Sequence, residues 1–467
     1  MPSVRTALAP LTLVFLAAAC ADTQPVATST PAPTRQSGST VTMPSMEGPP
    51  ATTQPVSPSI VVESVVDAPM VVQPVAQTVL TGADVLVRDG FAQLRGMRIG
   101  LIANHTTASG GTHLADLMHG RSDVTLVALF GPEHGVRGDA DAGAKIADGR
   151  DTRTGLPAYS LYGPNRAPTD AQMEGLDALV FDVQDVGSRF YTFISTMGLS
   201  MQSAARKGIP FVVLDRPNPL GGDYIGGFTL LPAQRSFVGQ FEIPQAHGLT
   251  VGELAQVLKG QRLVSGLENL DLRIVKMEGW RRGELWPETQ LAWPMPSPNI
   301  PTFETALVYA GTCLIEGTSA SEGRGTRTPF LRLGAPWANG ERLAASLNAR
   351  NLPGVRFRAA AFTPVSIAGM SAEPKLKDTP VQGIDIEVTN AQAVQPVELG
   401  VYVTHAFMDQ APDRAGFFDR AAFFDKLTGS PRLREMLVAG STPEAVIAAY
   451  TPEVARFRAA RAPYLLY

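Results

Sequence analysis

A series of short, mostly apolar runs constrains the fold of this 467-residue chain more than any other feature. The runs span residues 97–103, 124–130, 177–181 and 211–214. Segments with helical character separate them, near 112–119, from about Thr169, and over 191–207. Strands that are apolar on both faces are typical of a parallel sheet covered by helices. No G-x-G-x-x-G follows any run, so this Rossmann-like α/β pattern does not imply a dinucleotide.

The pattern becomes less regular after about residue 300. Strand-like pieces occur at 355–359 and 384–388, and the last fifty residues are predicted to be helical. We therefore expect two folded domains: a Rossmann-like catalytic domain over 81–298, and a smaller α+β C-terminal domain over 299–467 that completes a cleft.

The first twenty residues have the pattern of a secretory signal. One positive charge, Arg5, precedes an apolar stretch that is too short to span a bilayer. The stretch ends Leu-Ala-Ala-Ala-Cys, which resembles a bacterial lipobox with Cys20 as the lipidated residue. The alternative is an ordinary cleavage site with a chance cysteine. We expect a lipoprotein anchored in a membrane of the cell envelope on the periplasmic side, and Ala21 favours the outer membrane in a Gram-negative cell.

Residues 21–80 hold ten prolines and only five charged residues. Such a segment buries too little apolar surface to offset its ordering entropy, so we predict a disordered tether. The whole chain has a net charge of −4 and no basic block, which argues against nucleic acid as a partner. The second cysteine, Cys313, is predicted to be a lone buried thiol, because no disulfide framework can be built.

Polar residues follow each of the four apolar runs. Parallel strands bring their carboxyl ends to one edge of a sheet, where ligands bind. The residues at these ends are Asn104 and His105, then Glu133 and His134, then Asp182, Gln184, Asp185, Arg189 and Tyr191, and finally Asp215 and Arg216. A helix cap or a loop ion pair explains any one of them, but four such ends together indicate a site.

Glu133 is the strongest catalytic candidate, because it lies in a glycine-bracketed loop directly after a buried run. Partial burial favours the protonated form of a carboxyl group, which suits a general acid. The alternative is a structural ion pair with Arg137. His105 and His134 lack the local spacing of a metal site, so we expect neither a metal nor another cofactor.

A second polar cluster lies at 316–326, where Glu316, Glu322 and Arg324 occur among three glycines and several hydroxyls. A surface hairpin explains the glycines but not the density of acids. There is no G-x-S-x-G elbow, and no cysteine is placed as a nucleophile. Paired carboxylates with arginine and hydroxyl donors fit glycoside hydrolysis best.

The chain also resembles a known family in several segments. They read GLIANHT, LFGPEHGVRG, LVFDVQDVGSRFYTFISTM, VVLDRPNPLGG, FEIPQAHGLTVGELA, PSPNIPT and EGTSASEGRGTRTPF. These segments are similar to the exo-β-N-acetylmuramidase family of glycoside hydrolases, formerly a domain of unknown function. The resemblance covers about residues 80–467 and implies a Rossmann-like domain, a smaller C-terminal domain, and Glu133 as the leading catalytic residue. The chain departs from the family text at Ala103, where threonine is usual, and at Ser319, where asparagine is usual.

We therefore expect an exo-lytic β-1,4-N-acetylmuramidase that releases N-acetylmuramic acid from non-reducing ends of peptidoglycan fragments during cell-wall turnover. The alternatives are a non-catalytic cell-wall-binding lipoprotein and a glycosidase or esterase acting on another envelope glycan. The predicted catalytic residues are Glu133, His134, Asp185, Glu316 and Glu322, with the second carboxylate left open among the last three. The predicted substrate-binding residues are Asn104, His105, Asp182, Gln184, Arg189, Tyr191, Arg216 and Arg324. Arg189 and Arg324 are the first candidates to bind the lactyl carboxylate of muramic acid, and Arg216 is the third.

Overall fold

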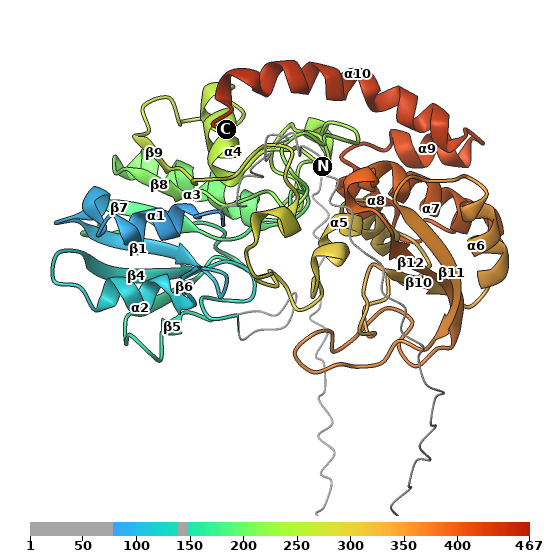
Figure 1. Ribbon diagram of the computed structural model, residues 1–467, viewed down its shortest axis with the longest axis horizontal. Helices are drawn as coiled ribbons and strands as arrows, with labels where there is room; N and C mark the ends of the chain where they lie inside the picture. Colours follow the sequence, from blue (N-terminus) through green and yellow to red (C-terminus); the bar gives the residue numbers. More distant parts are fainter. Residues whose placement is uncertain (1–77, 139–146) are drawn as a thin grey trace, which may run out of the picture. The chain divides into compact units, whose positions relative to one another are not determined.

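A mostly parallel sheet forms the first part of the fold (Figure 1). The computed structural model describes residues 78–138 and 147–467, so Cys20, the predicted signal and nearly all of the predicted tether lie outside the described residues. The sheet has seven strands, and every neighbouring pair is parallel except β5 and β6. In spatial order they are β5 (Gly149–Arg150), β6 (Pro157–Ser160), β4 (Thr125–Gly131), β1 (Arg98–Ala103), β7 (Ala178–Asp182), β8 (Phe211–Leu214) and β9 (Leu272–Val275).

Helices cover both faces of this sheet. The helices are α1 (Gly82–Arg88), α2 (Leu114–His119), α3 (Phe193–Lys207) and α4 (Val251–Gly260). Successive side chains of β1 alternate between two apolar clusters: Leu101 packs in the cluster that contains α1 and α2, and Ile102 in the cluster that contains α3 and α4. The four apolar runs are β4, β1, β7 and β8, side by side, which confirms the predicted Rossmann-like sheet.

The order of the strands defines where this sheet opens for a ligand. The chain leaves β1 toward β4 on one side, and it leaves β7 toward β8 on the other. Loops that diverge from neighbouring parallel strands leave a crevice at their carboxyl ends. The loops after β1, β4 and β7 therefore surround the expected ligand site.

The C-terminal part has a separate antiparallel sheet of three strands. In spatial order they are β10 (Arg332–Ala335), β12 (Val381–Val388) and β11 (Val355–Phe362). The helices of this part are α5 (Phe303–Thr312), α6 (Gly340–Asn348), α7 (Pro396–Gln410), α8 (Ala421–Thr428), α9 (Arg432–Val438) and α10 (Pro443–Arg461). This confirms the predicted α+β character and the helical end of the chain. The predicted boundary at 298/299 stays a prediction.

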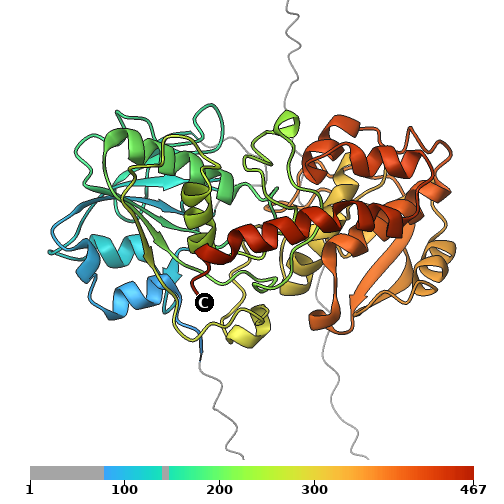
Figure 2. The ribbon, with the colours of Figure 1, turned by 90° about the horizontal axis from the view of Figure 1, so that it is seen from above.

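The last helix joins the two parts of the fold (Figures 1 and 2). Helix α10 begins beside α9 and ends near α4, where the side chain of Arg461 is buried. Arg461 donates to the carbonyls of Gly222, at 2.7 Å, and His247, at 3.0 Å. The hydroxyl of Tyr467 donates to Asp215 at 2.7 Å, so the C-terminal residues pack on the first sheet's loops.

Two predictions about the chain's organisation are wrong. The helix predicted from Thr169 is a single turn: Thr169 and Gln172 form reciprocal capping bonds, but Gly175, with φ 69°, ends the turn before β7. The tether was predicted to reach residue 80, yet Val79 and Leu80 are bonded to Thr289 and Glu278 and belong to the fold.

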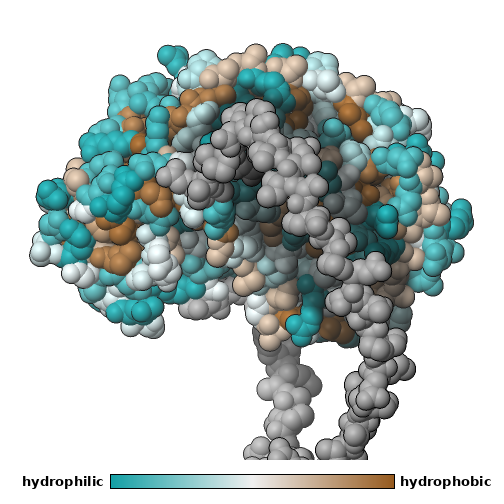
Figure 3. Space-filling model, in the orientation of Figure 1, coloured by the Kyte–Doolittle hydropathy of each residue, from teal (hydrophilic) through white to brown (hydrophobic). Residues whose placement is uncertain are grey.

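Within the described ranges, no helix is both long and apolar enough to cross a membrane. Large apolar side chains are exposed at Leu231, Met295, Val365 and Val438. On the face shown in Figure 3, apolar surface is scattered among polar surface.

Candidate active site

The loop after β4 fixes Glu133 in a tight turn. The amide of Gly135 donates to the carbonyl of Pro132 at 2.9 Å, and His134 has a left-handed φ of 72°. A side chain at Gly131 would meet the backbone of Val136 at 2.8 Å, so only glycine fits there. Glu133 is left half-buried at the carboxyl edge of the sheet.

Hydroxyl groups lie beside the Glu133 carboxylate. Thr192, which precedes α3, donates from Oγ1 to Oε2 of Glu133 at 3.1 Å. Burial, and next the charge of Glu133, raise the pKa of Tyr162 to about 12. Burial also raises the pKa of Tyr191, and the charges of Glu133 and Asp185 raise it further. The loops after β4, β6 and β7 therefore meet at one carboxylate, which is the geometry that a general acid requires.

A second group of charges, the 316–324 cluster, comes from the C-terminal part. We define it as Glu316, Glu322 and Arg324, and Lys375 lies beside it. Nη2 of Arg324 bonds Oε1 of Glu316 at 2.8 Å, and Nε lies 3.6 Å from Oε1 of Glu322. Burial raises the pKa of Glu322, while the positive charges of Lys375 and Arg324 act in the opposite direction.

Arg324 connects this cluster with the hydroxyls around Glu133. Its charge acts to lower the pKa of both Tyr162 and Tyr191, so the guanidinium lies near the groups that surround Glu133. About a quarter of the Arg324 side chain is exposed (24%). The two polar clusters predicted from separate parts of the sequence are therefore brought together.

Asp185 pairs with a histidine that the sequence reasoning did not select. Nδ1 of His247 accepts a bond from the amide of Leu249 at 3.2 Å, which places the ring proton on Nε2. That nitrogen lies 3.8 Å from Oδ2 of Asp185, and both side chains are buried. Oδ2 of Asp185 also accepts from the amide of Gly187 at 2.6 Å, whereas Oδ1 has no hydrogen-bond partner among the described residues.

Buried polar atoms mark the crevice between β1 and β7. Oδ1 of Asn104 accepts two bonds from Thr106, at 2.6 and 2.9 Å, while its Nδ2 has no partner within the described part of the chain. Gln184 donates to the carbonyls of Asp185 and Pro217, each at 2.8 Å, and its Oε1 likewise has none there. The hydroxyl of Tyr191 is also buried and has no hydrogen-bond partner among the described residues. Such atoms suit hydrogen bonds to a sugar.

Two arginines predicted to bind substrate have other surroundings. Arg189 is fully buried and donates to the carbonyls of Phe228, Ile243 and Leu427 at 2.7 to 3.0 Å. Its guanidinium thus holds three chain segments together and is closed to a sugar carboxylate, so its surroundings do not fit the predicted substrate-binding role.

Arg216 and Asp182 form a buried pair that is bonded at 2.5 and 2.8 Å. Each neutralises the other, so neither the predicted substrate role of Asp182 nor that of Arg216 fits its surroundings.

His105 and Arg137, which was the alternative ion-pair partner for Glu133, also have defined contacts. His105 bonds the carbonyl of Met295 through Nε2 at 2.8 Å, which links the loop after β1 to the segment before α5. Arg137 forms its ion pairs with Asp116 and Asp151, each at 2.8 Å, so it anchors the loop from behind.

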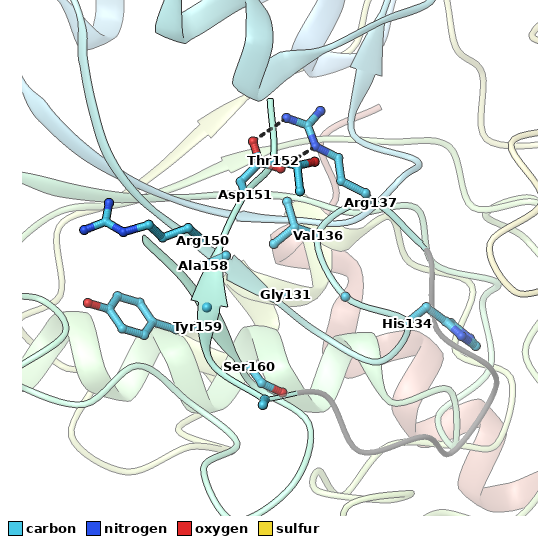
Figure 4. Close-up of a pocket in the computed structure, with 13 residues that line it drawn as sticks. Gly131, His134, Val136, Arg137, Arg150, Asp151, Thr152, Ala158, Tyr159 and Ser160 are labelled. Carbon is cyan, nitrogen blue, oxygen red and sulfur yellow. Dashed lines mark hydrogen bonds and ion pairs between the residues drawn. The ribbon is translucent and has the colours of Figure 1, made fainter. Parts of the chain in front are cut away.

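A pocket adjoins the far side of this loop (Figure 4). It is lined by His134, the Arg137–Asp151 pair, and β5 and β6, and it does not include Glu133 or the 316–324 cluster. Within residues 78–138 and 147–467, no three His, Cys, Asp or Glu side chains are grouped closely enough to hold a metal ion.

The fold and the site define a class of protein. The edge of an α/β sheet carries a half-buried carboxyl group with hydroxyl donors around it. Further carboxylates and an arginine lie beside it, and this set of groups is typical of a glycoside hydrolase.

The chain belongs to the exo-β-N-acetylmuramidase NamZ family and is a glycoside hydrolase. The model of the family's N-terminal domain matches residues 99–304, and the model of its C-terminal domain matches residues 307–467. The peptidoglycan β-N-acetylmuramidase NamZ of Bacillus subtilis (strain 168) is 43% identical over 392 residues, which are 83% of this chain and 91% of that protein.

Two solved structures of DUF1343 family proteins from Bacteroides fragilis NCTC 9343 share the fold. One is 38% identical with a TM-score of 0.77, and the other is 31% identical with a TM-score of 0.68. Each match covers 84% of this chain and 99% of the solved chain.

Four residues of the site were missed at the level of sequence: Tyr162, Thr192, His247 and Lys375. Thr192 and His247 lie inside the segments that carry the family resemblance, so a search of those segments for hydroxyl and imidazole groups finds them. Tyr162 likewise lies in a segment that resembles the family, DTRTGLPAYSLYG, whereas Lys375 follows no buried strand and carries no local signal.

Proposed function

We propose that this enzyme releases N-acetylmuramic acid from the non-reducing ends of peptidoglycan fragments, with Glu133 as the general acid. One observation carries the assignment: Glu133 is held half-buried at the sheet edge by a strained turn and a bond from Thr192. A carboxyl group in this position is ready to protonate the glycosidic oxygen as the bond to the leaving sugar breaks.

Asp185 is the second carboxylate of this proposal. Its charge and that of Glu133 act on the same Tyr191 hydroxyl, so the two carboxylates flank one position. The Nε2–H group of His247 faces Oδ2 of Asp185 at 3.8 Å, and both side chains are buried. Glu316, in contrast, is bonded to Arg324, and Glu322 lies between Arg324 and Lys375. The carboxyl group of Asp185 is therefore in a position to activate water or to orient the acetamido group of the substrate.

Arg324 is the residue that we propose to select muramic acid. Muramic acid differs from N-acetylglucosamine by a lactyl group with a carboxylate, and arginine binds carboxylates with two parallel hydrogen bonds. Of the three arginines predicted from sequence, Arg189 and Arg216 are closed off by their own partners. Arg324 remains partly exposed and lies near the hydroxyls around Glu133.

The test of this function is hydrolysis of a chromogenic N-acetylmuramic acid glycoside by wild type and by Glu133→Gln. The substitution keeps the shape but removes the transferable proton, so we expect the rate to fall by about 10²- to 10⁴-fold with an unchanged melting temperature. Glu174→Gln is the matched control, because that side chain is 81% exposed and pairs only with Lys207 on the surface. Near-wild-type activity of Glu133→Gln would remove Glu133 from the mechanism.

The same assay tests the non-catalytic alternative. A cell-wall-binding protein has no need of a carboxyl group held in a strained turn. If the wild type binds muramic-acid saccharides but never cleaves them, the binding function stands and the hydrolase proposal fails.

We also propose that Cys20 is lipidated and anchors the enzyme in the cell envelope. The support is the Leu-Ala-Ala-Ala-Cys sequence and the proline-rich segment that follows it. Cys20→Ser is expected to release the protein from the membrane fraction or to leave the precursor uncleaved. A mutant that is processed normally and still floats with membranes would refute the anchor.

A further inference from the structure

Lys375 is surrounded by backbone carbonyls in the way that ligands surround a cation. Its Nζ lies 2.7 Å from the carbonyl oxygen of Thr318, 2.9 Å from that of Ala320, 3.0 Å from that of Ile315 and 3.1 Å from that of Glu316. An ammonium group has only three N–H donors, so the four carbonyl oxygens must share them around one positive charge. The lysine comes from the connection between β11 and β12, residues 363–380, far from these carbonyls in sequence.

The four carbonyls belong to the segment that carries the acids of the 316–324 cluster. They lie in the 3₁₀ helix Cys313–Gly317 that continues α5 and in the turn that follows it. The last carbonyls of a helix lack partners within it, and a cation there is favourable. A helix cap alone accounts for this much of the arrangement.

A contact with Glu322 goes beyond a cap. Nζ of Lys375 also lies 3.6 Å from Oε2 of Glu322, a buried oxygen with no hydrogen-bond partner among the described residues. The other carboxyl oxygen of Glu322 faces Arg324. The ammonium group of Lys375 thus touches both the backbone of the cluster and one of its charges.

The connection that bears Lys375 is fastened on both sides of the cluster. The amide of Val365 donates to the carbonyl of Gly325 at 3.0 Å, and Nδ2 of Asn299 donates to the carbonyl of Met370 at 2.7 Å. Gly325 has φ 80°, and a side chain there would meet Pro374 at 2.6 Å. Residues 363–380 are therefore packed against the 316–324 cluster.

We propose that Lys375 is a positioning residue of the enzyme, whose ammonium group ties the 315–320 carbonyls together and thereby holds Glu322 and Arg324 in place beside Glu133. The inference rests on the proposed function, because Arg324 is there the group that contacts substrate. Misplacing such a group by about 1 Å is enough to cost about 10²-fold in rate.

The charge of Lys375 also sets how Glu322 titrates. The groups that face Glu322 are Lys375, Glu316, Arg324 and the thiol of Cys313. Burial and Glu316 favour protonation of Glu322, while Lys375 and Arg324 oppose it. Without Lys375, Glu322 stays protonated to a higher pH and loses its pairing with Arg324.

The first experiment compares Lys375→Met with Lys377→Met. Lys377 lies on the same connection, pairs with Glu373 on the surface at 2.9 Å, and makes no contact with the cluster in the described structure, so it is a matched control. We expect Lys375→Met to lower kcat on the muramic-acid glycoside by about 10- to 100-fold. The acid limb of its pH profile should move to higher pH, and Lys377→Met should change neither.

The second experiment restores the cation in Lys375→Ala. Propylammonium replaces the missing carbons and N–H donors, whereas tetramethylammonium supplies the charge without the donors. We expect propylammonium to recover at least tenfold of the lost activity and tetramethylammonium to recover none. If Lys375→Met does not fold, Lys375→Ala purified in propylammonium and then dialysed provides the same comparison.

Hydrogen exchange separates this proposal from the proposed function. Amides of 313–325 should be protected in the wild type and in Lys377→Met, and exposed in Lys375→Met, whatever the substrate is. If the wild type does not hydrolyse the glycoside, the proposed function is wrong, but the exchange measurement still tests the role of Lys375. Unchanged exchange, or a lowered melting temperature with unchanged kcat and pH profile, overturns the positioning role.

Discussion

Two arginines in this enzyme have similar predicted roles but opposite surroundings. Arg189 donates only to backbone carbonyls, and burial lowers its pKa to about 9, which still leaves it charged at pH 7. Arg324 is also buried in large part, which acts to lower its pKa, but the charges of Glu316 and Glu322 outweigh burial and raise it. Arg189 thus holds chain segments together through bonds to their carbonyls. Arg324, in contrast, is a positive charge that neighbouring carboxylates balance, beside the proposed catalytic carboxyl group.

The difference teaches that the acceptor, more than the position after a strand, decides what a buried arginine does. Backbone carbonyls accept three bonds from Arg189, and its positive charge has no carboxylate partner among the described residues. Carboxylates pair with Arg324 and balance its charge, while part of its side chain stays exposed to a charged substrate. The predictions below test this contrast in order of decreasing effect.

Arg189→Met should cause the largest loss of stability. It removes the Arg189 donor from the carbonyls of Phe228 and Leu427 and leaves Ile243 only the bond from the amide of Leu230. Unsatisfied buried groups cost about 1–3 kcal/mol each. We expect the free energy of unfolding in urea to fall by about 3–5 kcal/mol in total. The kcat/KM per folded molecule should change by less than about threefold. Arg235→Met, which removes a surface pair with Glu242, is the control. A stable Arg189→Met with altered sugar preference would reverse the contrast.

Arg324→Met should affect specificity more than stability. We expect the preference for a terminal muramic acid over a terminal N-acetylglucosamine to fall by about 10- to 100-fold, or about 1.4–2.7 kcal/mol. The measurement is the ratio of kcat/KM for the two glycosides. An equal loss on both substrates would show that Arg324 only balances its neighbouring acids.

The Arg137–Asp151 pair adds a third kind of arginine, one paired with carboxylates for structure. Hydrogen bonds from Arg137 hold the pKa of Asp151 below its ordinary value. A lowered pKa contributes stability above about pH 4, and this contribution is lost as the pH falls further. We expect Asp151→Asn to lower the free energy of unfolding by about 1–2 kcal/mol at pH 7 and by less at pH 3. An equal loss at both pH values would contradict the ion-pair account.

Tyr162→Phe should have the smallest effect. The hydroxyl lies beside Glu133, and a single neutral hydrogen bond contributes about 0.5–1.5 kcal/mol. We expect kcat/KM on the muramic-acid glycoside to fall by about two- to tenfold with little change in stability. A fall as large as that of Glu133→Gln would make Tyr162 part of the proton transfer.

The sheet was predictable because its evidence is local. Runs such as 126–130 and 211–214 are apolar at every position, which is the pattern of a strand buried on both faces. Strand β9 was not predicted, since three of its four residues are only half-buried and its apolar signal is weaker.

The site was predictable only in part, because its contacts are not local. Glu133, Asp185 and Arg324 were selected from turns and strand ends, and these stay predictions until they are tested. The partners of Arg189 lie at residues 228, 243 and 427, and those of Lys375 lie some 55 to 60 residues earlier in the chain. Nothing within a short window of sequence indicates which carbonyls a distant cation will meet.

The C-terminal residues can bond the loops of the first sheet only after they have been translated. Arg461 bonds the carbonyl of Gly222, 239 residues earlier, and Tyr467 bonds Asp215, 252 residues earlier. The last strand of the large sheet, β9, ends at Val275, so Tyr467 is translated 192 residues after that sheet's sequence is complete. At about 5–20 residues per second, this takes roughly 10–40 s. Throughout that interval the buried Asp215 lacks its C-terminal partner, and the bonds that close the first sheet's loops are among the last to form.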